Sequence, residues 1–564
     1  MCEPFVDTRI EPDRYRHWTV AHDGPVATVT LAVDPDGGLR AGDYELKTNS
    51  YDLSVDIELR DLIERLRFEH PEVRAVVVTG GLDKIFCAGA NIQMLATSSH
   101  AHKVNFCKLT NETRNSIEDA TANSGQAWIA AVNGTAAGGG YELALACDEI
   151  LLVDDRSSAV SLPEVPLLAV LPGTGGLTRV VDKRHVRRDR ADAFATRTEG
   201  IRGRQAVEWG LVDAVAPASG FDELVAERAA ARVEAAERGA GADEGPGVSL
   251  TPLARTEAAD GLRWSSVSVA IDRQLRAATI TVEAPSGPQP TTPDELVVAG
   301  AEAWVLAAAR ELDDAILHLR FNEPEIGTWL LATRGDPAAV LAAESVLVPP
   351  ADGPEHWLAR EVRLLWARVL KRLDVSARSL FALIEPGSCF AGLLVELAMA
   401  ADRSYMLEGT WEDPDRETDL PAPTLQLSVL NRQGLTMGNG LTRLESRFWG
   451  RPDDLAAAVE VVGQPLDGPE AEAVGLVTAA MDDIDWEDEI RVMIEERASF
   501  SPDALTGMEA NHRFVGPETM ETKIFARLTA WQNWIFQRPN AVGPEGALQR
   551  FGTGSRPDFD RRRV

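Results

Sequence analysis

The sequence predicts an α/β fold that is built twice along one chain. Residues 57–68 have the apolar spacing of a helix, and residues 73–79, which follow Pro71, have the pattern of a buried strand. A helix that leads into a buried strand is typical of α/β architecture. Short motifs of the first half also return in the same order in the second half, which indicates an internal duplication.

The repeated motifs cover most of each half. Alternating apolar residues predict strands at 18–20 and 26–31 near the start of the first copy. Chance does not readily give several matches in one order, so a duplication is the economical explanation. The matching pairs are residues 66–73 with 319–326, 176–179 with 440–443, and 210–212 with 475–477.

The most informative stretch is residues 133–148, in which Gly138, Gly139 and Gly140 run into a helix-forming segment. Glycine lets the backbone come close to a ligand, and a helix start offers free N–H groups with positive dipole character. This combination predicts an anion site, with Glu142 one turn inside the helix. The same stretch recurs at 386–402, where the glycine triplet has become Gly-Leu-Leu at 392–394. We therefore expect only the first copy to be active.

The copies divide the chain into four expected parts. An active module at 1–237 is followed by a connector at 238–261, which is rich in Ala, Gly, Asp and Glu. A degenerate module is expected at 262–498. Residues 499–564 are rich in aromatic and apolar side chains and are expected to form packing helices.

Composition excludes some classes of function. The 564 residues carry a net charge of −32, which repels nucleic acid and anionic membranes. The five cysteines are scattered and have no paired spacing, as in proteins of a reducing compartment. No stretch is long and apolar enough to span a bilayer, and the first residues have no apolar signal region. We expect a cytoplasmic protein.

Three segments of the first copy carry polar and backbone groups suited to chemistry. They are residues 85–92, the glycine-rich helix start with Glu142, and residues 161–165 with Glu164, followed by the Pro-Gly-Thr-Gly-Gly run at 172–176. Their order and spacing resemble the crotonase (enoyl-CoA hydratase/isomerase) superfamily over roughly residues 18–217. The resemblance implies the crotonase fold, here duplicated in tandem with a degenerate second copy.

The resemblance also implies a thioester site. In the superfamily two backbone N–H groups bind the thioester carbonyl oxygen of an acyl-CoA, and the matching positions are Ala90 and Gly139. Such paired donors stabilise an enolate oxygen, and each is worth roughly 3 kcal/mol in comparable oxyanion holes. Two glutamates share the acid and base roles in the hydratases, and Glu142 and Glu164 match them. Two carboxylates around one water are expected to titrate as a coupled pair.

Further positions follow less directly. The carbonyl of Ala88 falls where family members bind the adenine of coenzyme A, and Lys47 is a candidate phosphate contact. Asn91 replaces the Asp common in the family, which is expected to change the hydrogen bonds around the site. His100 and His102 lack companion ligands at metal-binding spacing, so we expect surface histidines and no metal.

The second copy serves as an internal control. Ser428 aligns with Glu164, the glycine triplet is lost, and Glu396 survives near the position of Glu142. Without the anion site, Glu396 has no oxyanion to act on. We expect residues 267–481 to be catalytically silent and to serve packing, oligomerisation or pocket shape.

The doubled length and the tail at 528–540 resemble the large, ring-cleaving members of the superfamily, over nearly the whole chain. That resemblance implies oxygen-independent hydrolysis of 2,3-epoxy-2,3-dihydrobenzoyl-CoA to 3,4-dehydroadipyl-CoA semialdehyde and formate, in aerobic benzoate degradation. It requires no metal or redox cofactor, since the substrate is carried as a coenzyme A thioester. We expect a homodimer or a higher homo-oligomer.

Two alternatives stay open. The same four positions would serve a hydratase, isomerase or hydrolase that acts on another bulky acyl-CoA. A protein that only binds acyl-CoA, or a scaffold with the second module as its interaction surface, is the other alternative. The intact pair of Glu142 and Glu164 argues against it, because binding alone needs neither carboxylate.

Overall fold

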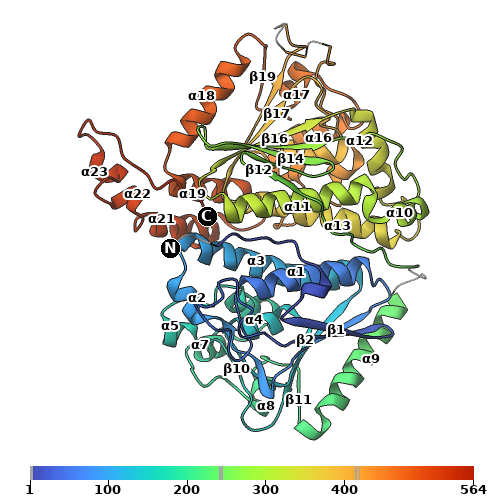
Figure 1. Ribbon diagram of the computed structural model, residues 1–564, viewed down its shortest axis with the longest axis vertical. Helices are drawn as coiled ribbons and strands as arrows, with labels where there is room; N and C mark the ends of the chain where they lie inside the picture. Colours follow the sequence, from blue (N-terminus) through green and yellow to red (C-terminus); the bar gives the residue numbers. More distant parts are fainter. Residues whose placement is uncertain (1–3, 240–244, 413–415, 418) are drawn as a thin grey trace. The chain divides into compact units, whose positions relative to one another are not determined.

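The computed structural model describes residues 4–239, 245–412, 416–417 and 419–564. The chain divides into two compact units, Met1–Pro252 and Leu253–Val564, which are coloured blue to green and green to red in Figure 1. Within the described residues, no helix combines the length and the apolar character needed to cross a membrane.

The first unit is built on a six-stranded sheet in the order β1-β2-β4-β7-β9-β11. Strands β1 and β2 form an antiparallel hairpin, and the others are parallel. The strands predicted at 18–20 and 26–31 are confirmed as β1 and β2, and the one predicted at 73–79 begins two residues later, as β4. The strands are β1 (Trp18–Asp23), β2 (Val26–Leu31), β4 (Ala75–Gly80), β7 (Ala127–Val132), β9 (Glu149–Val153) and β11 (Ala214–Ala216).

Helices cover this sheet. The predicted helix at 57–68 is confirmed within α1, whose first turn is capped by the Asp52 side chain, which accepts a hydrogen bond from the N–H of Ser54. Apolar side chains of β4, β7 and β9 form a core with α9. The helices are α1 (Leu53–Phe68), α2 (Ile92–Thr97), α3 (His100–Asp119), α4 (Gly139–Ala146), α5 (Glu164–Leu168), α6 (Gly176–Thr178), α7 (Arg188–Ala195), α8 (Gly203–Glu208) and α9 (Phe221–Gly239).

Five short strands carry the segments that the sequence singles out. Strand β3 (Ser50–Tyr51) pairs with β6 (Gly89–Ala90). Strands β5 (Lys84–Cys87), β8 (Gly134–Ala137) and β10 (Val160–Ser161) form a second small sheet with β8 in the middle. Because β8 leads directly into α4, this small sheet sets where that helix begins.

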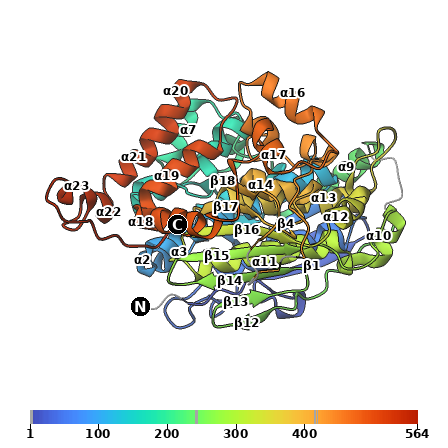
Figure 2. The same cartoon turned by 90° about the horizontal axis from the view of Figure 1, so that it is seen from above.

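The second unit repeats the sheet of the first. Its last six strands, β14-β15-β16-β17-β18-β19, again consist of an antiparallel hairpin followed by parallel strands. Figure 2 shows β12 to β18 side by side in chain order. The same order and directions in both units agree with a tandem duplication. The strands are β12 (Thr256–Ala258), β13 (Gly261–Arg263), β14 (Val267–Asp272), β15 (Ala277–Glu283), β16 (Thr328–Arg334), β17 (Ser379–Ile384), β18 (Arg403–Leu407) and β19 (Ala479–Met481).

The covering helices also correspond. Side chains of β17 and β18 form a core with α18, much as β7 and β9 do with α9 in the first unit. The helices are α10 (Pro293–Ala299), α11 (Trp304–Asn322), α12 (Pro337–Glu344), α13 (Trp357–Asp374), α14 (Val395–Ala400), α15 (Arg443–Arg447), α16 (Pro452–Glu460), α17 (Gly468–Val474), α18 (Trp486–Ser499), α19 (Pro502–Arg513), α20 (Met520–Lys523), α21 (Thr529–Ile535), α22 (Pro539–Val542) and α23 (Ala547–Arg550).

The stretch at 238–261 is not connector throughout. Residues 240–244 of it lie outside the described part of the chain, but β12 and the first residue of β13 fall inside it. Strand β12 pairs antiparallel with β13 and so extends the sheet of the second unit at its edge. Its residues, Thr-Glu-Ala, carry little apolar signal because all three are exposed.

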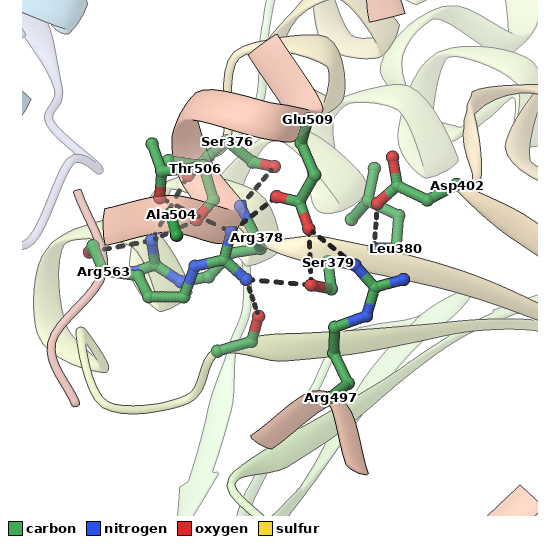
Figure 3. Close-up of polar contacts among 12 residues, drawn as sticks. Ser376, Arg378, Ser379, Leu380, Asp402, Arg497, Ala504, Thr506, Glu509 and Arg563 are labelled. Atoms are coloured by element: carbon green, nitrogen blue, oxygen red, sulfur yellow. Dashed lines mark hydrogen bonds and ion pairs between the residues drawn. The ribbon is translucent and has the colours of Figure 1, made fainter. Parts of the chain in front are cut away.

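The C-terminal helices predicted at 499–564 are present, and buried charged side chains bond the first of them, α19, to the sheet of the second unit. Glu509 of α19 accepts hydrogen bonds from the hydroxyl of Ser379 at 2.6 Å and from Arg497 at 3.4 Å. It also pairs with Arg563, whose guanidinium donates to Ser379 as well (Figure 3). Arg563 is 3% exposed. One buried carboxylate therefore joins α19, the end of the chain and strand β17.

Candidate active site

Helix α4 begins at Gly139, directly after the positive φ of 53° at Gly138. The structure adds a reason for the glycine triplet that differs from close approach of a ligand. A Cβ at position 138 would lie 2.5 Å from a carboxylate oxygen of Glu164, and one at 139 would overlap the hydroxyl of Tyr51. A Cβ at position 140 would overlap the carbonyl oxygen of Cys87. Each glycine is thus required by side chains or backbone of the site itself.

The structure brings the two predicted N–H donors onto adjacent segments. A Cβ at Gly89 would lie 2.8 Å from the nitrogen of Gly139, so strand β6 touches the start of α4. The N–H of Asn91 donates to the carbonyl of Tyr51 at 2.8 Å. Successive N–H groups of a strand point to opposite sides, so the N–H of Ala90 points away from β3. The N–H of Gly139 lies in the first turn of α4, where the helix provides no acceptor.

Glu142 is buried on the first turn of α4, and its carboxylate is held by three donors. The N–H groups of Thr174 and Gly176 donate to it at 3.0 and 2.7 Å, and the hydroxyl of Thr174 donates to its other oxygen. These bonds fix the position and orientation of the carboxylate. The loop at 172–176 therefore has the specific task of orienting Glu142, which the sequence did not reveal.

Glu164 opens helix α5 and is half-buried. One of its carboxylate oxygens lies beside Gly138, and the other is buried without a hydrogen-bond partner among the described residues. Burial, with a smaller contribution from the nearby charge of Glu142, raises the pKa of Glu164 to about 7. The two predicted glutamates therefore differ: Glu142 is held by donors, and Glu164 is able to hold a proton near neutral pH.

The predicted coenzyme A contacts lie at the exposed rim. Ala88 is exposed, and its N–H donates to the carbonyl of Thr48 at 3.2 Å. The ammonium of Lys47 lies 2.8 Å from Glu45, and its side chain is 70% exposed. Both positions are therefore accessible, and neither is brought into the buried part of the site.

Asn91 explains how this rim is held. Its side-chain oxygen accepts from the N–H of Met94 and caps α2, while its amide donates to the carbonyl of Glu45 at 2.9 Å and to the hydroxyl of Ser50 at 3.2 Å. A carboxylate has no N–H to donate. The change from the usual Asp thus adds bonds that tie the loop around Lys47 to α2.

The two histidines at the start of α3, His100 and His102, differ in exposure. His100 is exposed, as expected, but the expectation of a surface position is wrong for His102, which is buried at 7% exposure. His102 lies in the first turn of α3, whose inward face packs against α1. Within the described ranges, no group of three or more His, Cys, Asp or Glu side chains is arranged to hold a metal ion.

Sequence reasoning missed Tyr51 and Cys107. Tyr51 is 2% exposed and lies on β3, opposite Ala90. Its only signal was an aromatic residue between the Lys47 segment and an amphipathic helix. The thiol of Cys107 lies beside the loop of Thr174, 3.6 Å from where a Cβ of Gly173 would be. Burial and the charge of Glu142 raise its pKa to about 11, so it carries its proton at neutral pH.

The second unit shows what became of the corresponding place. Glu396 on α14 is buried, and it accepts hydrogen bonds from Asn431 at 2.8 Å and from Arg443 at 3.3 Å. Arg443 also pairs with buried Asp374 at 2.8 Å. Burial raises the pKa of Glu396. This surviving carboxylate is enclosed in a network of protein partners.

A second buried carboxylate, that of Glu344, lies near Glu396. Glu344, the last residue of α12, is 2% exposed and accepts a hydrogen bond from the N–H of Leu393, which aligns with Gly139. A Cβ at Gly392 would overlap the Glu344 carboxylate, as one at Gly138 would approach that of Glu164. Burial raises the pKa of Glu344 to about 7, although a hydrogen bond with the side chain of Ser428 partly opposes this increase. Glu344 thus occupies the place of Glu164 from a different element.

A family model and several solved structures resemble part of the chain. Residues 45–240 match the enoyl-CoA hydratase/isomerase family. Among solved structures, an enoyl-CoA hydratase of Geobacillus kaustophilus is 32% identical over 39% of this chain and 75% of its own, with a TM-score of 0.34. One of Bacillus anthracis is 28% identical over 40% and 84%, with a TM-score of 0.33.

A curated protein matches over nearly the full length. The benzoyl-CoA-dihydrodiol lyase of Aromatoleum evansii is 55% identical over 560 residues, which cover 99% of this chain and 98% of that protein. With more than half of its residues shared from end to end, the chain belongs to the benzoyl-CoA-dihydrodiol lyase family of crotonase-fold enzymes.

Proposed function

We propose that the chain cleaves the ring of 2,3-epoxy-2,3-dihydrobenzoyl-CoA with two waters, giving 3,4-dehydroadipyl-CoA semialdehyde and formate. The observation that carries the proposal is the 55% identity with a benzoyl-CoA-dihydrodiol lyase over nearly the whole chain. The geometry of the first unit supports it, because Glu142 and Glu164 flank a helix start that offers backbone donors.

In the first stage, the N–H groups of Ala90 and Gly139 bind the thioester oxygen. Protonated Glu164 gives its proton to the epoxide oxygen, while Glu142 accepts a proton from the attacking water. The resulting diol loses the proton of its C2 hydroxyl, and the bond between ring carbons 2 and 3 breaks. Its electron pair flows through the conjugated double bonds to the thioester oxygen, where the two donors stabilise the negative charge.

In the second stage, the first enolate is protonated on ring carbon 1, which restores the thioester carbonyl, and the enol at carbon 3 becomes an aldehyde. Carbon 2 is then a formyl group beside the thioester. A second water adds to it, and the hydrate collapses to formate as the bond to ring carbon 1 breaks. The electron pair again goes to the thioester as an enolate, which is then protonated on carbon. Both bond-breaking steps thus place charge on the oxygen bound by Ala90 and Gly139, and neither requires an oxidant.

The division of labour between the carboxylates follows from their surroundings. Burial and the charge of Glu142 raise the pKa of Glu164 to about 7, which suits a group that gives and recovers a proton near neutral pH. The three donors around Glu142 fix the orientation of its carboxylate, which we propose accepts the proton of the attacking water. Ala88 and Lys47 are proposed to contact the adenine and phosphate of coenzyme A at the rim.

The setting of the enzyme is part of the same proposal. A cytoplasmic location is supported by scattered cysteines and by the supply of acyl-CoA substrates there. A homodimer or higher homo-oligomer is supported by exposed apolar side chains of the C-terminal helices, among them Met520 at 73% and Phe525 at 67% exposure. The proposed chemistry needs no metal or redox cofactor.

The deciding experiment compares two substrates. Purified protein should release formate from 2,3-epoxybenzoyl-CoA and should hydrate crotonyl-CoA poorly. Hydration of crotonyl-CoA without formate release would instead favour a hydratase. Replacing Glu142 by Gln should lower turnover by roughly 100- to 10,000-fold and spare the affinity for benzoyl-CoA. Unchanged turnover would instead favour a protein that only binds acyl-CoA.

A further inference from the structure

The hydroxyl of Tyr51 is a polar group that the proposed reaction has not used. The residue is 2% exposed, and its hydroxyl oxygen is buried without a hydrogen-bond partner among the described residues. A buried hydroxyl that makes no bond costs stability, and phenylalanine would fill the same space without that cost. Packing alone therefore does not account for a tyrosine here.

The hydroxyl points at the donors of the thioester site. It lies so close to Gly139 that a Cβ there would overlap it. The backbone of Tyr51 is also paired with Ala90 in the ladder between β3 and β6. One residue thus lies against both segments that supply the N–H groups of the oxyanion hole.

The ring is held firmly in this position. It packs against Phe106, with ring centroids 5.9 Å apart, and the guanidinium of Arg114 lies 5.7 Å from its centroid. Arg114 is itself fixed by a buried ion pair with Asp56 at 2.7 Å. A donor that is already aimed needs little reorganisation when charge develops nearby.

We propose that the Tyr51 hydroxyl donates a third hydrogen bond to the thioester oxygen, beside the N–H groups of Ala90 and Gly139. This inference rests on the proposed function insofar as the site binds a thioester. Burial raises the pKa of Tyr51 well above its ordinary value, so the hydroxyl keeps its proton and acts as a donor. The negative charge formed in both bond-breaking steps is then shared among three donors.

The test is Tyr51→Phe, with Tyr141→Phe as the matched control. Tyr141 is also buried, but its hydroxyl donates to the carbonyl of Leu211 at 2.7 Å. Tyr51→Phe should lower formate release by roughly 100-fold, as loss of one oxyanion donor does, and should leave the midpoint of thermal unfolding unchanged or raised. Tyr141→Phe should lower that midpoint and spare turnover per folded enzyme.

A binding measurement separates this proposal from the reaction. The infrared carbonyl band of bound benzoyl-CoA, labelled with carbon-13 at the thioester, should shift to lower frequency in the wild type and less in Tyr51→Phe. A normal shift with no formate release from the epoxide would overturn the proposed function and keep the role of Tyr51. Equal bands and equal formate release in both proteins would overturn the role of Tyr51 and keep the function.

Discussion

The two units hold a carboxylate against a glycine at the same place, but they supply it from different elements. In the first unit Glu164 of α5 lies against Gly138, and in the second Glu344 of α12 lies against Gly392. Glu164 leaves one oxygen without a protein partner among the described residues, whereas Glu344 accepts the N–H of Leu393. The second unit therefore still places a hydrogen-bond acceptor at its helix start, and that acceptor belongs to the chain.

The second carboxylate of each pair shows the same difference. Neutral donors of the Thr174 loop hold Glu142, and Arg179 supports that loop by donating to the carbonyl of Thr174 at 3.1 Å. Arg443, which aligns with Arg179, instead pairs directly with Glu396. A carboxylate enclosed by Asn431 and Arg443 is not available to a substrate. The second unit thus differs from the first in two ways: it lacks some residues of the site, and its remaining carboxylates are bonded to other groups of the protein.

The largest expected contrast is between Glu142→Gln and Glu396→Gln. The first should lower formate release by roughly 100- to 10,000-fold, because an acid–base group is lost. The second should leave turnover per folded enzyme unchanged and lower the unfolding midpoint, because buried Arg443 loses a charged partner. Steady-state formate assays and thermal unfolding of both variants check this. Loss of turnover in Glu396→Gln would mean that the second unit is not silent.

Next in size is the effect of a methyl group at the helix start. Gly139→Ala should lower turnover by about 100- to 1,000-fold, because the new Cβ overlaps Tyr51 and displaces an oxyanion donor. Leu393→Ala, at the aligned position, should cost roughly 2–5 kcal/mol of stability and leave turnover intact. Turnover and chemical unfolding are measured on each variant. Full activity of Gly139→Ala would show that the N–H of Gly139 is not an oxyanion donor.

Glu344 offers a stability test with a pH signature. Glu344→Ala should lower the free energy of unfolding by about 2–5 kcal/mol, because a cavity forms and the N–H of Leu393 loses its acceptor. Glu344→Gln keeps an acceptor of the same shape. Because the pKa of Glu344 is raised to about 7 in the folded state, the wild type loses stability as pH rises from about 4.5 to 7.

Glu344→Gln removes that loss, so its advantage over the wild type should grow across the same range. Urea unfolding at pH 5 and pH 8 measures it. An advantage that does not change with pH would show that Glu344 is charged in the folded state throughout.

The pH dependence of turnover depends on Glu164. Burial and the charge of Glu142 raise the pKa of Glu164 to about 7, so the protonated acid disappears above that pH. Turnover should fall about tenfold for each pH unit above 7 if Glu164 supplies a proton. Glu396→Gln should keep this profile unchanged. A rate that rises through pH 8 would assign Glu164 the role of base instead.

The smallest expected effect is at the rim. Lys47→Ala should raise the KM for the acyl-CoA by no more than about fivefold, because an exposed charge contact is worth up to about 1 kcal/mol. Arg451→Ala removes a similarly exposed, ion-paired side chain from the second unit and should leave the KM for the acyl-CoA unchanged. Higher salt should reduce the difference in KM between Lys47→Ala and the wild type, since exposed charges are screened.

The sequence predicted the parts of the site that have a local signature. The glycine triplet, the helix start and both glutamates stand in recognisable motifs, and the repeat revealed the second unit. Tyr51, Glu344 and the task of Thr174 were missed, because each acts through tertiary contacts that no spacing in the chain encodes. Strand β12 was missed because its exposed residues carry no apolar pattern. His102 was misjudged because a polar residue on a helix gives no sign of which face it occupies.

The carboxylate of Glu344 also bears on how this chain can evolve. Restoring a glycine at position 393 would leave Glu344 in the hole, and shortening Glu344 alone would leave a cavity and an unpaired N–H. Position 428 would still lack a glutamate. None of these three substitutions alone rebuilds the site, and each alone is expected to destabilise the second unit or do nothing. We therefore expect a second active site to be harder to rebuild than the first is to alter, and the second unit to vary only where its packing allows.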